Sequence, residues 1–210
     1  MKNKYQKYLF FTSTNIIYKR GIKMSATNRG TERKPYDFYA TPINVVENLL
    51  NNIDLNQYGD KILEPSAGNG NICRVIKNYY PNKNVTALEI REEEFENLIQ
   101  CSDKVIIDDY LQIEMKTKYN IIIGNPPYSK AIEFVNKSLE LLEENGVLIF
   151  LLRTAFLESK SRYDFWQKNP LSGLYTLSKR PSFTGKGTDA TSYSWFIWDK
   201  QTTDQYIKII

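Results

Sequence analysis

The residues best suited to chemistry lie in two short segments, in a chain that contains no histidine. The first segment, Leu63–Cys73 (LEPSAGNGNIC), carries two glycines between a short apolar run and a helical pattern. The second is the tetrapeptide Asn125–Tyr128 (NPPY), which follows an apolar run. A glycine-rich turn that enters a helix is typical of nucleotide sites. The absence of histidine excludes Ser-His-Asp and Cys-His nucleophiles and the usual imidazole base.

The glycine turn indicates a nucleoside site. Gly68 and Gly70 allow the backbone to turn tightly and to approach a ligand without a Cβ in the way. Glu89 ends the next strand-like run, where an acid can accept hydrogen bonds from both ribose hydroxyls. Glu64 lies directly before the turn, and a carboxylate there repels phosphates but attracts an ammonium or sulfonium group. These features favour S-adenosylmethionine over NAD.

The tetrapeptide is suited to hold an sp² amino group, such as that of adenine, cytosine or glutamine. The Asn125 Oδ1 and the Pro126 carbonyl can accept both hydrogens of the amine, which favours a pyramidal nitrogen with its lone pair aimed at the methyl group. Positioning and fixed dipoles then replace an ionised general base. Tyr128 offers a flat face to a base extruded from a duplex, where stacking contributes about 1–3 kcal/mol. Phe183 is the candidate for a second aromatic contact.

The elements that must position these residues follow an alternating pattern. After Thr41-Pro42, a cap and first-turn residue, apolar residues recur at helical spacing from Ile43. Strand-like runs then alternate with helices, which predicts an α/β, Rossmann-like fold with a mostly parallel, seven-stranded sheet covered on both faces. The predicted strands are 61–63, 85–90, 105–107, 120–123, 147–152, 174–177 and 192–198, and the predicted helices lie near 70–79, 91–100, 130–144 and 158–168. The last two strands predict an antiparallel hairpin at the sheet edge.

The 210 residues fit one domain with a basic extension. Residues 1–35 carry nine Lys or Arg residues and one acid, without a sustained hydrophobic period, so they are interpreted as a flexible N-terminal extension. Residues 36–210 are interpreted as a single catalytic domain. Residues 153–187 carry seven basic residues and two acids, so a polyanion would meet these two segments.

Composition excludes several other classes. Cys73 and Cys101 form no CxxC pair, so neither a disulfide framework nor a zinc site is expected, and no metal is predicted. No window approaches the ~20 apolar residues that a membrane helix needs. No cleavage site follows the apolar stretch 8–17. The expectation is therefore a cytoplasmic protein that is not exported.

Together these motifs resemble the Rossmann-like, S-adenosylmethionine-dependent methyltransferases. In that family the Glu-Pro-x-x-Gly-x-Gly turn wraps the methionine end of the cofactor, an acid after the second strand holds the ribose, and an acid after the third contacts the adenine amino group. Asp109 is the first choice for the last role; for Asp108 the alternative is a solvated strand end. The cofactor residues that the resemblance implies here are Glu64, Pro65, Ser66, Ala67, Gly68, Gly70, Glu89, Ile90, Asp108, Asp109 and Tyr110.

The order of motifs narrows the resemblance. Asp37–Pro42 (DFYATP), the glycine turn, the acids and then NPPY are similar to the γ-order DNA methyltransferases that modify the exocyclic N6 of adenine, over about residues 36–199. The family likeness implies that Tyr39 and Thr41, beside Pro42, contact the methionine carboxylate. It places Asn125, Pro126, Pro127 and Tyr128 at the reacting amine. Base and DNA contacts would come from Lys130, Arg180, Phe183 and Lys186.

One departure leaves alternatives open. Many members of the family carry a separate target-recognition domain, and no segment here is long enough to be one. Recognition of DNA would then rest on short loops and the basic segment, or on a separate specificity subunit, or would be slight; a monomer or weak dimer is expected. The rival hypotheses are methylation of RNA adenine or protein glutamine, and a non-catalytic nucleic-acid-binding subunit with the same fold.

Overall fold

The computed structural model describes residues 40–183 and 189–210 and the backbone of one earlier strand, Tyr18–Lys19. The strands are β1 (Tyr18–Lys19), β2 (Lys61–Glu64), β3 (Asn84–Glu89), β4 (Lys104–Ile107), β5 (Tyr119–Gly124), β6 (Leu142–Arg153), β7 (Gly173–Thr176), β8 (Tyr193–Asp199) and β9 (Tyr206–Ile209). The α-helices are α1 (Ile43–Leu50), α2 (Asn71–Tyr79), α3 (Phe95–Leu98), α4 (Ala131–Leu141) and α5 (Tyr163–Lys168). Short 3₁₀ turns occur at Leu55–Gln57, Glu92–Glu94, Tyr128–Lys130, Thr154–Leu157 and Lys160–Arg162.

All these strands form one sheet, with the order β1-β4-β3-β2-β5-β6-β8-β7-β9. Strands β1 to β6 pair in parallel, whereas β8 runs antiparallel to both β6 and β7. The strand order reverses between β2 and β5, and open α/β sheets bind ligands at the carboxyl ends of the strands beside such a reversal. The glycine turn follows β2 and the tetrapeptide follows β5, so both predicted segments lie at this point.

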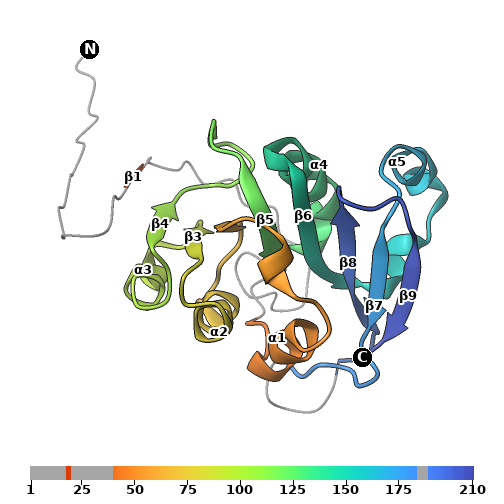
Figure 1. Cartoon of the computed structure of the whole chain (residues 1–210), viewed down its shortest axis with the longest axis horizontal. Coiled ribbons are helices and arrows are strands. Elements are labelled where there is room, and N and C mark those ends of the chain that lie inside the picture. The colour runs from red at the N-terminus through yellow and green to blue at the C-terminus, as the bar shows by residue number, and fades with distance from the viewer. Residues whose placement is uncertain (1–17, 20–39, 184–188) are drawn as a thin grey trace, which may run out of the picture.

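Apolar residues on alternate strand positions build a core on each face of the sheet. In β5, Ile121 and Ile123 face one core, whereas Ile122 faces the other. Helices α1 and α2 supply the first core and α4 the second, so the central strands are buried on both sides. Figure 1 shows α1, α2 and α3 grouped together, with α4 and α5 on the opposite side of the sheet.

The predicted α/β fold is confirmed, and the differences are local. The sheet has nine strands rather than seven, because β9 pairs with β7 and the strand Tyr18–Lys19 pairs with β4. The antiparallel pair β7–β8 forms as predicted but is not the sheet edge, since β9 lies outside it. Helix α5 begins at Tyr163 rather than near residue 158, and residues 92–98 form a 3₁₀ turn and one helical turn instead of a long helix.

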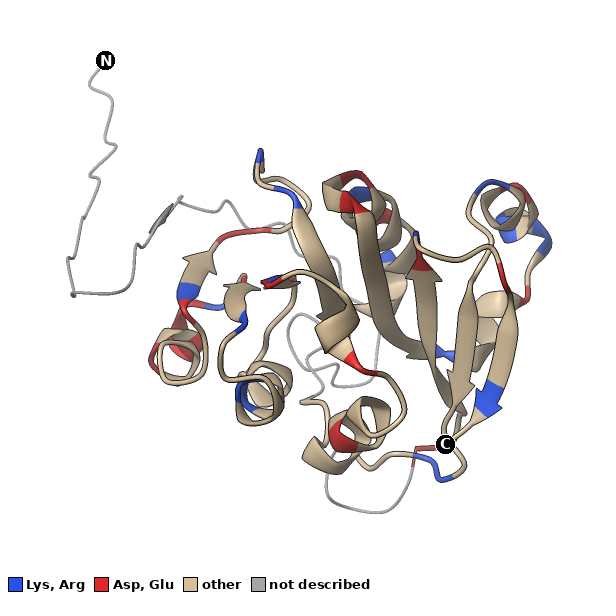
Figure 2. Ribbon diagram, in the orientation of Figure 1, with Lys and Arg blue, Asp and Glu red and all other residues tan. Residues whose placement is uncertain are grey.

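The charged residues and the helix lengths of the described part of the chain are those of an ordinary α/β domain. Figure 2 shows the charged residues mainly on helices and loops, while most of the strand length carries uncharged residues. Within the described part of the chain, no helix has the length and apolar character needed to cross a bilayer.

Candidate active site

The glycine turn is held in a conformation that requires its glycines. Gly68 and Gly70 have φ of 57° and 81°, in the left-handed region that disfavours other residues. The Gly68 N–H donates to Oε2 of Glu89 at 2.7 Å. A Cβ on Gly70 would lie only 2.5 Å from the Cys101 Sγ. The turn therefore packs tightly against α3 and is tied to the end of β3.

The Glu64 side chain links the glycine turn to the start of α2. It is buried, and its Oε2 accepts hydrogen bonds from the backbone N–H of Cys73 at 3.1 Å and from the Cys73 Sγ at 2.7 Å. Burial raises the pKa of the Glu64 carboxyl well above its usual value. This corrects the picture of an open carboxylate before the turn, because the side chain lies against the N-terminus of α2.

Two acids end neighbouring strands beside the turn. Glu89 is buried, and Oε1 forms an ion pair with Arg91 at 2.9 Å. Asp108 is also buried rather than solvated, and its Oδ1 accepts from the backbone N–H of Asp109 at 2.8 Å. Asp109 is half-buried, and its Oδ1 accepts from the backbone N–H of Leu111 at 2.9 Å. Both strand ends thus carry carboxylates in fixed orientations.

Tyr110 is a correction to the predicted cofactor set as far as its side chain is concerned. Its ring is 2% exposed and lies 5.0 Å from the ring of Phe134. Its hydroxyl forms a hydrogen bond of 2.9 Å with the Ser138 hydroxyl on α4. The ring therefore belongs to the core beneath α4 and is not a ligand contact.

Thr41 joins the start of α1 to both predicted segments. Its Oγ1 accepts a hydrogen bond of 3.1 Å from the Asn125 Nδ2, and its carbonyl accepts one of 2.9 Å from the Asn71 Nδ2 on α2. The N-cap of α1 is Pro42, not Thr41, so the threonine side chain serves the site instead of the helix. The bond to Thr41 directs the amide nitrogen of Asn125 toward α1 and its Oδ1 away from it.

The rest of the tetrapeptide forms a compact turn. The Pro127 carbonyl accepts from the backbone N–H of Lys130 at 2.9 Å, and Pro126 is buried. The Tyr128 ring lies 5.6 Å from that of Tyr193, which lies 5.1 Å from that of Phe183. Burial raises the pKa of the Tyr128 phenol well above its usual value. The phenol therefore stays neutral at physiological pH.

Comparisons with known proteins agree with this geometry. The family model described as "Methyltransferase small domain" matches residues 45–165, more than half of the chain. The chain belongs to the methyltransferase small domain family. A Type II methyltransferase, M.AccI of Acinetobacter calcoaceticus, is 31% identical over 112 residues, which are 51% of this chain and 21% of that protein. M.CvrRI, a Type II methyltransferase of Paramecium bursaria Chlorella virus XZ-6E, is 28% identical over 119 residues, 47% of this chain and 31% of that protein.

A solved structure supports the fold. A protein of Listeria monocytogenes described as a class I S-adenosylmethionine-dependent methyltransferase superposes with a TM-score of 0.61 at 15% identity, over 80% of this chain and 64% of that one. The methyltransferases of the family to which the chain belongs use S-adenosylmethionine, so S-adenosylmethionine is the cofactor of this methyltransferase. The stretch aligned with each of the two curated relatives is less than a third of that relative's length.

The residues around the glycine turn fit this cofactor. The Ser66 Oγ is buried and has no hydrogen-bond partner among the described residues, and it lies 3.7 Å from a Cβ built on Gly124. A buried hydroxyl without a partner costs free energy unless a ligand supplies one. The carboxylates of Glu89 and Asp108 lie on the same edge. Together they offer a cationic, hydroxyl-bearing cofactor an acceptor-rich site.

The remaining predicted residues fall into three groups. Pro65 and Ala67 are buried within the turn, and Pro42 and Ile90 are half-buried at its rim. Lys130 and Arg180 are exposed, and Lys130 forms an ion pair with Glu133 at 3.2 Å. Tyr39 and Lys186 lie outside the described residues. The site assignments to these residues therefore stay predictions.

The sequence did not predict that Arg153 and Tyr193 lie beside the tetrapeptide. Arg153 at the end of β6 places its Cζ 5.1 Å from the centroid of the Tyr128 ring. Tyr193, the first residue of β8, pairs with Arg153 of β6, and its hydroxyl donates to the Asp189 Oδ2 at 3.0 Å. Both strand residues lie within predicted strands, where the pattern carries no signal of a site. Only the register between β6 and β8 brings them to the tetrapeptide.

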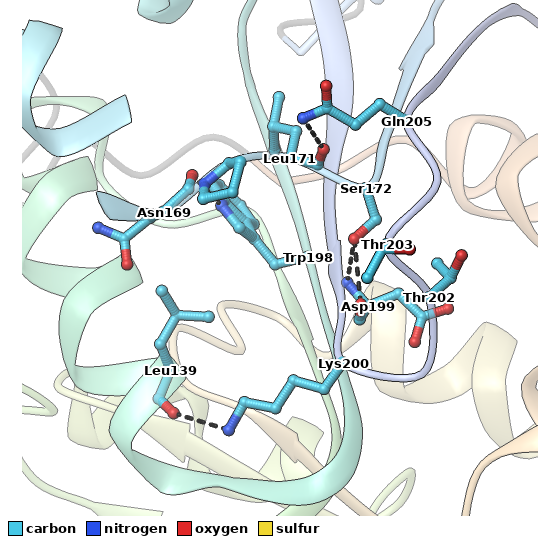
Figure 3. A pocket seen from close by; sticks show the side chains of 11 residues that line it. Leu139, Asn169, Leu171, Ser172, Trp198, Asp199, Lys200, Thr202, Thr203 and Gln205 are labelled. Carbon is cyan, nitrogen blue, oxygen red and sulfur yellow. Dashed lines mark hydrogen bonds between the residues drawn. The ribbon is translucent and has the colours of Figure 1, made fainter. Parts of the chain in front are cut away.

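A separate hollow of about 330 Å³ lies beside the end of β8, away from the carboxyl end of β6 (Figure 3). Asp199, which lines it, pairs with Val147 near the start of the core part of β6, whereas the site lies at the end of β6. Other lining residues are Leu139, Asn169, Leu171, Ser172, Trp198, Lys200, Thr202, Thr203 and Gln205. This hollow is distinct from the cofactor edge and has no part in the site.

Proposed function

We propose that this methyltransferase modifies the exocyclic N6 amino group of adenine in DNA, with the base turned out of the stack. The geometry of Asn125–Tyr128 carries the proposal: an amide oriented by Thr41, adjoining proline carbonyls and an aromatic ring, all at the end of β5. The two curated relatives are named Type II methyltransferases, which supports a DNA substrate.

When bound, S-adenosylmethionine supplies an electrophilic methyl group. The residues of the chain position the amine that receives it. The Asn125 Oδ1 and the Pro126 carbonyl accept the two N–H bonds of the amine, which directs the nitrogen lone pair out of the plane of the ring. Tyr128 holds the base by stacking. The amine loses one proton after the methyl transfer, and this proton passes to solvent, so no ionised side chain is needed as a base, in agreement with a chain that lacks histidine.

In this proposal short loops and basic residues of the chain, rather than an inserted domain, recognise the substrate. The 3₁₀ turn Tyr128–Lys130 leads directly into α4 at Ala131, so no recognition domain is inserted at this position. We propose that residues 36–210 act as one catalytic domain and that the basic residues 1–35 and 153–187 contact the polyanion, alone or beside a specificity subunit. The loop between Pro181 and Asp189 is closed by a backbone bond of 3.0 Å and carries Phe183 toward Tyr193.

The test is a parallel transfer assay with radiolabelled S-adenosylmethionine. The purified full chain is incubated with unmethylated duplex DNA, with single-stranded RNA and with a protein extract, and the labelled nucleoside or amino acid is identified by mass spectrometry. Formation of N6-methyladenine in DNA supports the proposal. Label in RNA adenine or in glutamine alone would replace it with the corresponding rival. Absence of cofactor binding by calorimetry would instead favour a non-catalytic subunit.

A further inference from the structure

Arg153 occupies a defined place beside the reacting tetrapeptide. Strands β5 and β6 run parallel, with Gly124 paired to Phe150, so the last residues of β6 pass the tetrapeptide. Arg153 ends β6 and pairs with Tyr193 of β8. Its guanidinium lies over the ring of Tyr128, with Cζ 5.1 Å from the ring centroid. The strand ends, rather than a loop, therefore hold this side chain at the site.

The guanidinium is accessible, and no acid among the described residues forms an ion pair with it, although Asp189 lies near enough to act on its charge. Arg153 is exposed, and among the described residues it forms no salt bridge. By contrast, Arg91 pairs with two glutamates beside the cofactor turn. The nearby acid Asp189 already accepts hydrogen bonds from the Tyr193 hydroxyl and from the Thr191 N–H. The Arg153 guanidinium does interact with the Tyr193 side chain, but it carries five N–H donors, so donors remain for a ligand.

An arginine in this position suits one part of a nucleotide substrate. Its planar guanidinium stacks on aromatic rings and also donates two parallel hydrogen bonds to a phosphate. A base that stacks on Tyr128 brings its own phosphodiester to the edge of that ring. A contact of an exposed cation with a ring is weak. A charge-assisted bond to a phosphate is stronger than this contact and can replace it together with the neutral hydrogen bond to Tyr193.

We propose that Arg153 binds a phosphate of the nucleotide whose base stacks on Tyr128. In the absence of substrate the guanidinium covers the ring, and it turns to the phosphodiester when the base arrives. This proposal rests on the proposed function, since it needs a nucleic acid at the site. It assigns Arg153 to substrate binding, whereas Tyr193 holds the ring of Tyr128 from the side.

The test needs variants that separate charge from packing. Arg153→Gln keeps a planar, long side chain without charge. Arg153→Lys keeps the charge but loses the planar guanidinium with its two parallel donors. With the unmethylated duplex DNA that accepts the label in the transfer assay, Arg153→Gln should raise the KM for DNA by about 10- to 100-fold, the loss of one charge-assisted hydrogen bond. The slope of log affinity against log salt should fall by about one. Arg153→Lys should keep the slope.

A neutral methylphosphonate at either phosphate flanking the target adenosine locates the contact. At one of them the wild type should lose as much affinity as Arg153→Gln does, and Arg153→Gln should lose nothing further. The proposal would be overturned if the methylphosphonate and Arg153→Gln lowered the affinity additively. It would also be overturned if neither methylphosphonate changed the affinity of the wild type. A lower kcat with an unchanged salt slope would overturn it too, because that result indicates a packing role for Arg153.

Lys118→Ala is the control for charge, because Lys118 is exposed just before the start of β5, at the opposite end of that strand from the tetrapeptide. It should leave the KM for DNA and the salt slope unchanged. If the wild type transfers no methyl group to DNA, the proposed function fails. If it does so while Arg153→Gln behaves as the wild type, only the inference about Arg153 fails.

Discussion

Gly70→Ala should destabilise the cofactor turn by two separable effects. An alanine at φ of 81° costs about 1–2 kcal/mol relative to a relaxed backbone. Its Cβ would also lie 2.5 Å from the Cys101 Sγ and 3.2 Å from the Leu98 Cδ2. Overpacking of this kind costs about 1–3 kcal/mol. The sum, about 2–5 kcal/mol, corresponds to a fall in Tm of about 4–20 °C for a chain of this size.

Cys101→Ala separates the two effects because it removes the sulfur that the new Cβ would meet. In that background Gly70→Ala should cost the backbone contribution, about 1–2 kcal/mol, and the smaller strain of the contact with Leu98, so most of the packing cost of about 1–3 kcal/mol should appear as coupling between the two positions. Urea unfolding of the wild type, both single variants and the double variant measures it. Asn69→Ala, in the same turn, is the control and should change stability by less than about 0.5 kcal/mol.

The outcome decides between two descriptions of the turn. An equal cost of Gly70→Ala in both backgrounds would show that packing against Cys101 does not limit this position. A cost below about 0.5 kcal/mol in both would show that residue 70 is not held in the left-handed region. Calorimetry on the same variants should show weaker S-adenosylmethionine binding wherever the turn is strained.

Four further predictions concern the site. Asn125→Ala should nearly abolish kcat with little loss of cofactor affinity, since it removes an acceptor at the reacting amine; equal losses in kinetics and calorimetry would argue against that role. Glu89→Ala should chiefly weaken cofactor binding, because a ribose contact contributes equally before and during transfer; unchanged affinity would refute the assignment. Thr41→Val should lower kcat by up to about tenfold at similar KM, the worth of one neutral hydrogen bond, and Thr41→Ser should restore it. Burial raises the pKa of Glu64, so the free energy of unfolding should fall as pH rises above the ordinary carboxyl pKa; in Glu64→Gln, urea titrations should show that this fall is lost.

The sequence predicted the sheet because its central strands are buried on both faces. Continuous apolar runs such as Ile121–Ile123 leave no other consistent placement, and the observed strands begin and end within one or two residues of most predicted bounds. Strand β9 carried no such signal. Its residues are all exposed, so no alternation of buried and exposed positions marks it, and only its pairing with β7 defines it.

The predicted site residues differ in how well the sequence could place them. The glycine turn and the tetrapeptide were located because special backbone residues mark them. The position of the Tyr110 ring was not predicted, because the sequence does not show to which side the residue after a strand points. In the structure its hydroxyl forms a hydrogen bond with Ser138 in the core. Arg153 and Tyr193 lie 40 residues apart and meet through an antiparallel register that no local pattern encodes.

If the proposed transfer needs no general base, the rate depends on the orientation of Asn125, which the hydrogen bonds of Thr41 fix. Its hydroxyl orients Asn125 and its carbonyl binds Asn71, the first residue of the helix that follows the cofactor turn. Thr41, directly before the N-cap of α1, therefore links the tetrapeptide to the helix that follows the glycine turn. If the Asn125 amide turned over, it would present N–H groups to an amine that needs acceptors. In the proposed mechanism Asn125 acts by its orientation alone, so the Thr41 hydroxyl should control turnover although it does not contact the reacting atoms.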